Sequence, residues 1–119
     1  METTRTLLHR CLTQVEGDTG LLEELLDMLP SCLEDLMASF RKAVVDHDAT
    51  AAHEAAHSVK GMLANVGFFE LAELAYEIEQ LSKASRFSVA LERMEELAEK
   101  TNATVTEVRK LLENMPCGC

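Results

Sequence analysis

Apolar residues recur every three or four positions along almost the whole of this sequence. Only five Gly and two Pro interrupt its 119 residues, and the spacing follows the period of a helix rather than that of a strand. A helix with one apolar stripe must bury that stripe against other helices. The pattern therefore restricts the chain to an all-α fold.

Gly and Asp residues mark where the first two helices begin and end. A short helix over about 4–16 ends at Gly17, and Asp18 is the expected N-cap of a long, leucine-rich second helix. Pro30 falls inside this second pattern, where the missing backbone N–H either kinks the helix or makes it restart. The sequence thus predicts a short helix followed by a long one.

Three more helices follow the second one. Asp48 is the expected N-cap of a helix over about 49–66, which Gly67 ends. The next helix covers about 69–83, and its expected apolar stripe consists of Leu71, Leu74, Ala75, Ile78 and Leu81. After a loop with a new cap, the last helix extends from about 87 to 112. These lengths predict an antiparallel up-and-down four-helix bundle with a short extra N-terminal helix.

The charge balance excludes several classes of partner. Eleven Lys and Arg against 21 Asp and Glu give a formal net charge of −10, which repels nucleic-acid phosphates and anionic lipid headgroups. No segment approaches the roughly 20 apolar residues of a membrane span, and the N-terminus lacks the pattern of a secretory signal. We expect one cytoplasmic domain over 1–119, with a tail at 113–119 and no nucleic-acid or membrane partner.

The four cysteines do not have the spacing of a secreted disulfide framework. Cys11 and Cys32 fall within helical patterns, while Cys117 and Cys119 lie in the tail. We interpret all four as reduced thiols, which agrees with a cytoplasmic protein. A metal site or an intermolecular cross-link at Cys117 and Cys119 is the alternative.

The helix over 49–66 has two chemically different faces. At about 100° per residue, one face carries the apolar residues Ala52, Ala55, Val59, Met62, Leu63 and Val66. The opposite face carries His57, Lys60, Gly61 and Ala64. His57 is therefore expected to point away from the core.

Gly61 and Lys60 give this exposed histidine a chemical context. A Gly in a helix interior costs about 1 kcal/mol relative to Ala, and one turn after His57 it leaves room for a large partner to reach the ring. Lys60 adds an ammonium group that suits a transient phosphoryl group. An accessible His beside a cation is typical of a nucleophile for phosphoryl transfer.

Three segments of the chain resemble a known family. They are Ala56-His57-Ser58-Val59-Lys60-Gly61, then Ala64-Asn65-Val66-Gly67, and then Tyr76-Glu77-Ile78-Glu79 on the following helix. Together with the order of the helices, they resemble the histidine-containing phosphotransfer (HPt) domain. The likeness covers about residues 15–112.

The resemblance implies a role in a two-component phosphorelay. By the resemblance, His57 is the phosphoacceptor, Lys60 the cation beside the phosphate and Gly61 the residue that gives the partner access. The donor is the receiver domain of a response regulator, a histidine kinase or a hybrid sensor kinase, and the acceptor is a receiver domain. The chain is then a monomeric carrier without kinase activity or a cofactor of its own, and Mg²⁺ belongs to the receiver domain.

Glu79 lies at the height of His57 if the two helices form a hairpin. The turn falls near Gly67, so residues ten to twelve positions beyond it lie level with His57, which is ten positions before it. We expect Glu79 at the edge of the apolar stripe, where its carboxylate can accept a hydrogen bond from Nδ1–H of His57 and leave Nε2 free to attack. An ordinary solvated Glu is the alternative.

Two other interpretations use the same residues. His53, Glu54 and His57 match the H-E-x-x-H motif of zinc metallopeptidases, in which two His bind zinc and the Glu activates water. Such an enzyme needs a third protein ligand and a substrate cleft, and the sequence indicates neither. The other interpretation is a helical adaptor with a solvated His57 and Lys60, which leaves Gly61 unexplained.

Overall fold

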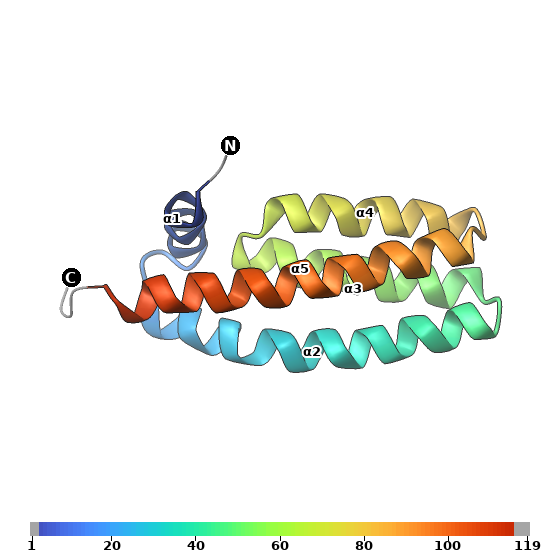
Figure 1. The fold of residues 1–119 in the computed structure, drawn as a ribbon, viewed down its shortest axis with the longest axis horizontal. Coiled ribbons are helices and arrows are strands. Elements are labelled where there is room, and N and C mark those ends of the chain that lie inside the picture. The colour runs from blue at the N-terminus through green and yellow to red at the C-terminus, as the bar shows by residue number, and fades with distance from the viewer. Residues whose placement is uncertain (1–2, 116–119) are drawn as a thin grey trace.

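The computed structural model describes residues 3–115 and contains five helices in that range. They are α1 (Thr4–Gln14), α2 (Thr19–Val45), α3 (Ala49–Val66), α4 (Phe69–Lys83) and α5 (Phe87–Glu113). Helices α2 to α5 lie side by side, with consecutive helices antiparallel, and α1 crosses one end of this bundle (Figure 1). The predicted all-α bundle with an extra N-terminal helix is confirmed.

Local capping interactions set most of the helix ends. The side chains of Asp18 and Asp48 each accept a backbone N–H at 3.0 Å, at the starts of α2 and α3. Gly67 ends α3 in the left-handed conformation, with φ of 95°. The new cap expected before α5 is wrong: in the described part of the chain, Arg86 precedes α5 without a side-chain cap hydrogen bond.

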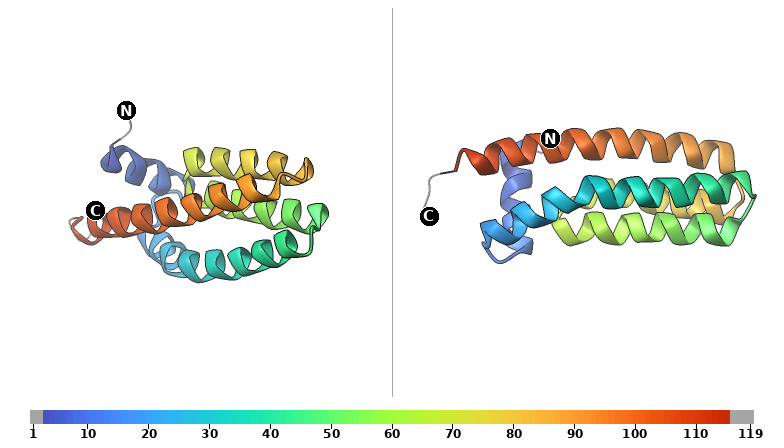
Figure 2. Two further views of the ribbon diagram at one scale, coloured as in Figure 1. Left: turned by 45° about the vertical axis from the view of Figure 1, so that its right-hand side comes forward. Right: turned by 90° about the horizontal axis from the view of Figure 1, so that it is seen from below.

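Two boundaries differ from the sequence prediction in informative ways. Helix α1 ends at Gln14 instead of residue 16, because Glu16 and Gly17 both take positive φ angles and turn the chain toward α2. Pro30 lies inside a continuous α2, so the restart is wrong. The helix is bowed (Figure 2), since one missing N–H removes one hydrogen bond and the packed turns on either side hold the rest.

The buried face of α4 is not the one that its leucines predict. Leu71, Leu74 and Leu81 are only partly buried. The buried residues of α4 are Ala72, Ala75, Ile78, Glu79 and Ser82. Helix α4 packs chiefly on α3, whose inner face also carries small residues, and small side chains let two helix axes approach closely. The helix is therefore turned so that Glu79 faces α3.

Helix α1 packs closely against the end of the bundle at Gly67. A Cβ atom at this position would lie 3.2 Å from the Cα of Cys11 on α1, so a side chain here would crowd α1 and strain the positive φ. Cys11 itself is fully buried, and burial raises the pKa of its thiol to about 11. The thiol is therefore protonated and unreactive at neutral pH.

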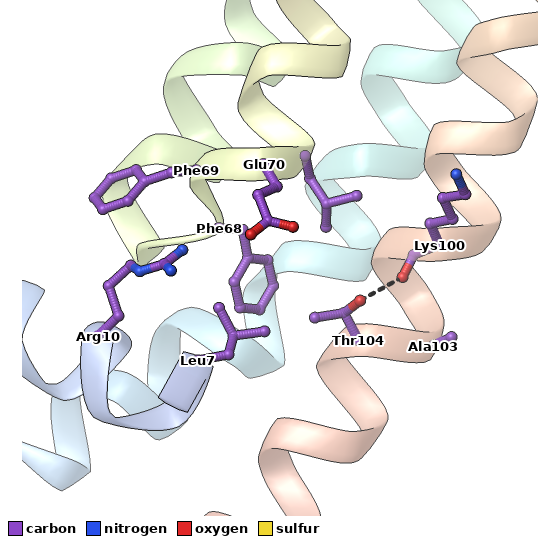
Figure 3. A pocket seen from close by; sticks show the side chains of 9 residues that line it. Leu7, Arg10, Phe68, Phe69, Glu70, Lys100, Ala103 and Thr104 are labelled. Atoms are coloured by element: carbon purple, nitrogen blue, oxygen red, sulfur yellow. Dashed lines mark hydrogen bonds between the residues drawn. The ribbon is translucent and has the colours of Figure 1, made fainter. Parts of the chain in front are cut away.

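A pocket of about 300 Å³ opens where α1, the start of α4 and α5 meet (Figure 3). Leu7 and Phe68 line it, with Arg10 and Lys100 on opposite sides. The Thr104 hydroxyl donates to the backbone carbonyl of Lys100 at 2.7 Å along one wall. None of the predicted site residues lines this pocket.

The described residues also bear on two predictions about location and redox state. No helix within residues 3–115 is long and apolar enough to cross a membrane. Cys11 and Cys32 are free thiols. The predictions for Cys117 and Cys119 lie outside the described residues.

Candidate functional site

The predicted site residues meet on the outer face of α3 and the adjoining edge of α4. His57 lies in the middle of α3 with 62% of its side chain exposed, as the helical projection predicts. Lys60 and Gly61 follow within one turn of the same helix. Glu79 reaches them from α4, because the α3–α4 hairpin turns at Gly67 and brings its two arms into register.

Glu79 is buried, which corrects the prediction that it sits at the edge of the core. Only 3% of its side chain is exposed. The reason is the turned face of α4, where Ala72 and Ala75 lie against α3 and carry Glu79 inward with them. A solvated Glu is thereby excluded, and its carboxylate needs partners inside the protein.

His57 provides the shortest of these contacts. Its Nδ1 lies 2.7 Å from Oε1 of Glu79. An ionised carboxylate only accepts hydrogen bonds, so Nδ1 carries the proton and donates it. In the neutral ring the lone pair then lies on Nε2, the nitrogen on the far side of the ring from Glu79.

Lys60 approaches the second carboxylate oxygen. Its Nζ forms an ion pair with Oε2 of Glu79 at 3.2 Å and also lies 5.1 Å from the centre of the Tyr76 ring. The ammonium group thus has an anion and an aromatic face as neighbours, both on α4. With 31% of its side chain exposed, Lys60 is accessible to an anion that arrives at His57.

The electrostatic balance keeps Glu79 ionised. Burial alone raises the pKa of its carboxyl group, but the hydrogen bond from His57 and the nearby Lys60 outweigh it and hold the pKa below its ordinary value. The carboxylate therefore remains an acceptor for Nδ1–H at neutral pH. The Nδ1-protonated form of His57 follows from this charge.

The flank of His57 toward α2 is open. A Cβ added at Gly61 would meet no atom within 4 Å. Beside Gly61 a groove of about 440 Å³ extends between α2 and α3. Its lining includes Leu25, Met28, Cys32, Ser58, Met62 and Asn65. Open space thus surrounds the Gly61 position, one helical turn after His57.

His53 also joins the site, and the sequence analysis missed this role. Its Nε2 lies 3.4 Å from Oε1 of Glu79, the oxygen that His57 contacts. The signal was present in the spacing, since His53, His57 and Lys60 are four and three positions apart and form one stripe along α3.

The arrangement does not support the metallopeptidase interpretation. His53 and His57 both turn toward the buried Glu79, whereas Glu54 is exposed on another side of α3. Within residues 3–115, no group of three or more His, Cys, Asp and Glu side chains has the geometry to hold a metal ion. Both histidines contact the Glu79 carboxylate in this structure.

Comparison with known families agrees with the geometry of the site. The family model of the Hpt domain matches residues 20–115, which is most of the chain. The chain belongs to the Hpt domain family. The resemblance in the sequence is thereby confirmed, and the matched region contains α3 to α5, all of α2 except its first residue, and all of the site residues.

Membership of the Hpt domain family indicates the general function of the molecule. Hpt domains carry out histidine phosphotransfer in two-component phosphorelays, where their partners are kinases and receiver domains. No curated protein and no solved structure matches this Hpt domain.

Proposed function

We propose that His57 is the phosphoacceptor of this Hpt domain and that Nε2 is the atom that reacts. The observation that carries the proposal is that His57 is both held and accessible. Its Nδ1 lies 2.7 Å from a buried carboxylate oxygen, while 62% of its side chain is exposed. A histidine that serves only as a solvated surface residue needs no such partner. The fixed Nδ1–H supports a nucleophilic Nε2.

The transfer is an in-line displacement at phosphorus. The Nε2 lone pair of His57 forms the new N–P bond as the P–O bond of an aspartyl phosphate breaks, and the electron pair of that bond returns to the aspartate carboxylate. Positive charge develops on the imidazole ring, and the Glu79 carboxylate stabilises it through Nδ1–H. Lys60 binds the phosphoryl oxygens from the side. The reverse step passes the group to the next receiver domain.

We assign the remaining parts of the reaction to the partners. The donor is the receiver domain of a response regulator, a histidine kinase or a hybrid sensor kinase, and the final acceptor is a receiver domain. Mg²⁺, which neutralises the transferring phosphoryl group, is bound by the receiver domain. The chain thus acts as a carrier without kinase activity or a cofactor of its own, whether free-standing or as a module of a larger kinase.

The groove beside Gly61 supports a docking position for the receiver domain. Met28 at its edge has 59% of its surface exposed, and Leu25 and Met62 are partly buried. An apolar patch of this kind allows docking without long-range attraction, which suits a chain with a formal charge of −10. The same net charge supports a monomer, and the free thiols of Cys11 and Cys32 support a cytoplasmic location.

The test is transfer of labelled phosphate from a phosphorylated receiver domain. We expect an acid-labile, base-stable adduct that maps to His57, and no adduct in His57→Gln. This variant keeps a side-chain donor toward Glu79, so its helix content and melting temperature should remain close to those of the wild type. Label that persists in His57→Gln, for example on His53, would refute the assignment, and a large loss of stability would show that the imidazole is structural.

A further inference from the structure

Two histidines of α3 contact the same carboxylate oxygen. Oε1 of Glu79 lies 2.7 Å from Nδ1 of His57 and 3.4 Å from Nε2 of His53. The two rings are nearly parallel, with 6.2 Å between their centroids and 21° between their planes. They therefore present opposite nitrogens to one atom, one at the short distance of a charge-assisted hydrogen bond and one at a longer distance.

His53 is the more enclosed of the two rings. Its side chain is 28% exposed, against 62% for His57. It lies one helical turn before His57, and Lys60 lies almost one turn after it. The hydrogen bond between His57 and Glu79 is thus flanked on both sides by groups that contact the same carboxylate.

A buried carboxylate with one strong partner has a second lone-pair direction to satisfy at Oε1. Water or another donor must take that place, because an unsatisfied buried charge is costly. Nε2 of His53 lies 3.4 Å from this oxygen, within the range of an ion pair. Because the carboxylate only accepts, His53 can satisfy this oxygen only in the form that carries its proton on Nε2.

We propose that His53 is a positioning residue for phosphoryl acceptance at His57. Its Nε2–H holds Oε1 of Glu79 in the orientation that accepts Nδ1–H of His57, and it keeps water from that oxygen. The reactive lone pair on Nε2 of His57 depends on this arrangement. The inference rests on the proposed function, because it takes His57 as the phosphoacceptor.

Removal of His53 should act through Glu79. In His53→Ala, water enters beside Oε1, competes for its lone pairs and lets the carboxylate rotate. The share of His57 rings with the proton on Nδ1 then falls, and the nucleophilic form becomes rarer. His53→Gln places an amide N–H at a similar reach and should restore much of the loss.

Phosphoramidate is a suitable probe because it needs no partner protein. The Nε2 lone pair of His57 forms the N–P bond, the P–N bond of phosphoramidate breaks with its electron pair on the leaving ammonia, and Nδ1 keeps its proton. We would compare the labelling rate of His57 in the full chain and in the variants His53→Ala, His53→Gln and His9→Ala. The last removes an exposed histidine from α1 as a matched control.

Nitrogen NMR of the unphosphorylated proteins, in mildly alkaline buffer where an ordinary histidine is neutral, gives a second measurement. It reports which ring nitrogen of His57 carries the proton. We expect His53→Ala to lower the Nδ1-protonated share and to slow labelling roughly three- to tenfold, the effect of one modest hydrogen bond. His53→Gln should lie near the wild type, and His9→Ala should not differ from it.

The outcomes separate this inference from the proposed function. A His53→Ala protein with the tautomer and labelling rate of His9→Ala would overturn the role of His53, and so would a His53→Gln protein as slow as His53→Ala. Label that maps to a residue other than His57 would overturn the proposed function instead, while the NMR comparison would still test whether His53 orients Glu79.

Discussion

The two flanks of His57 differ in what they offer the imidazole ring. Toward α4, the ring meets the buried carboxylate of Glu79, and Lys60 and Tyr76 complete a packed set of contacts. Toward α2, Gly61 leaves open space and an adjoining groove. One flank holds Nδ1 of the ring, and the other has open space beside Gly61. Holding the ring and exposing it are thus tasks of different residues.

The contrast originates in the inner face of the same hairpin. Ala52, Ala55 and Ala56 on α3 are buried, as are Ala72 and Ala75 on α4. Small side chains allow the two helices to approach closely, and this brings the Glu79 carboxylate within reach of the outward-facing His57. The groove toward α2 is lined by the longer side chains of Leu25, Met28 and Met62. The packing of the hairpin therefore sets the geometry of the site.

Removal of the Glu79 carboxylate, on the flank toward α4, should have the largest effect on phosphoryl acceptance. Glu79→Ala deletes the acceptor of Nδ1–H, and a hydrogen bond to a charged group is worth about 1.5–3 kcal/mol. Because each 1.4 kcal/mol is a factor of ten in rate, we expect phosphoryl acceptance to slow roughly 10- to 100-fold. Labelling rates with a phosphorylated receiver domain measure the loss.

Glu79→Gln is the matched control for this variant. Its side-chain oxygen still accepts a hydrogen bond, although without the charge, so the rate should fall between those of the wild type and Glu79→Ala. Equal rates for all three proteins would show that the 2.7 Å contact between Glu79 and His57 does not affect phosphoryl acceptance.

The difference between the flanks also shows what the sequence could and could not predict. Capping residues and helix lengths are local properties, so α2 to α4 begin and end close to the predicted positions, and the hairpin register brings Glu79 level with His57. The burial of Glu79 depends on which face of α4 meets α3. Alanines decide that face by close approach, while the leucine stripe indicated another one. In the sequence, His53 stands out only through its match to the H-E-x-x-H motif, because its contact with Glu79 exists only once two helices are packed.

Filling the open flank should separate docking from chemistry. Gly61→Leu extends a side chain into the space next to His57, and a mismatch in a packed interface costs about 1–3 kcal/mol. We expect transfer from a receiver domain to slow roughly tenfold, while labelling by phosphoramidate stays near the wild-type rate. Helix propensity should raise the free energy of unfolding by several tenths of a kcal/mol or more.

Gly61→Ala serves as the control, since a Cβ there meets no atom within 4 Å. It should gain similar stability and keep most of its transfer activity with the receiver domain. If Gly61→Leu transfers as fast as Gly61→Ala, the receiver domain does not approach along this flank, and the glycine needs another explanation.

Lys60, on the flank toward α4, should matter less than Glu79. Lys60 is partly exposed, and ion pairs in contact with solvent contribute about 0–1 kcal/mol. Lys60→Ala should therefore slow transfer, or shorten the lifetime of phosphorylated His57, by no more than about fivefold. Pulse-chase measurement of the phosphorylated protein tests both quantities. An unchanged rate and lifetime would reduce Lys60 to a partner of Glu79 and Tyr76.

The smallest expected effect is the acid dependence of stability that the Glu79 carboxylate adds. The pKa of Glu79 is lower in the folded protein than its ordinary value of about 4.3, so the unfolded chain binds the proton more readily. The stabilisation is complete above that ordinary pKa and disappears as the pH falls through the lower pKa of the folded state. Glu79→Gln has no such proton to bind. As the pH falls from about 5 to about 3, the wild type should lose more free energy of unfolding than Glu79→Gln does, as measured by denaturant titration.

Glu77→Gln, on the exposed side of α4 and paired with Arg93, is the control. If the difference for Glu79→Gln stays constant over this range, His57 and Lys60 do not hold the carboxylate in its charged form.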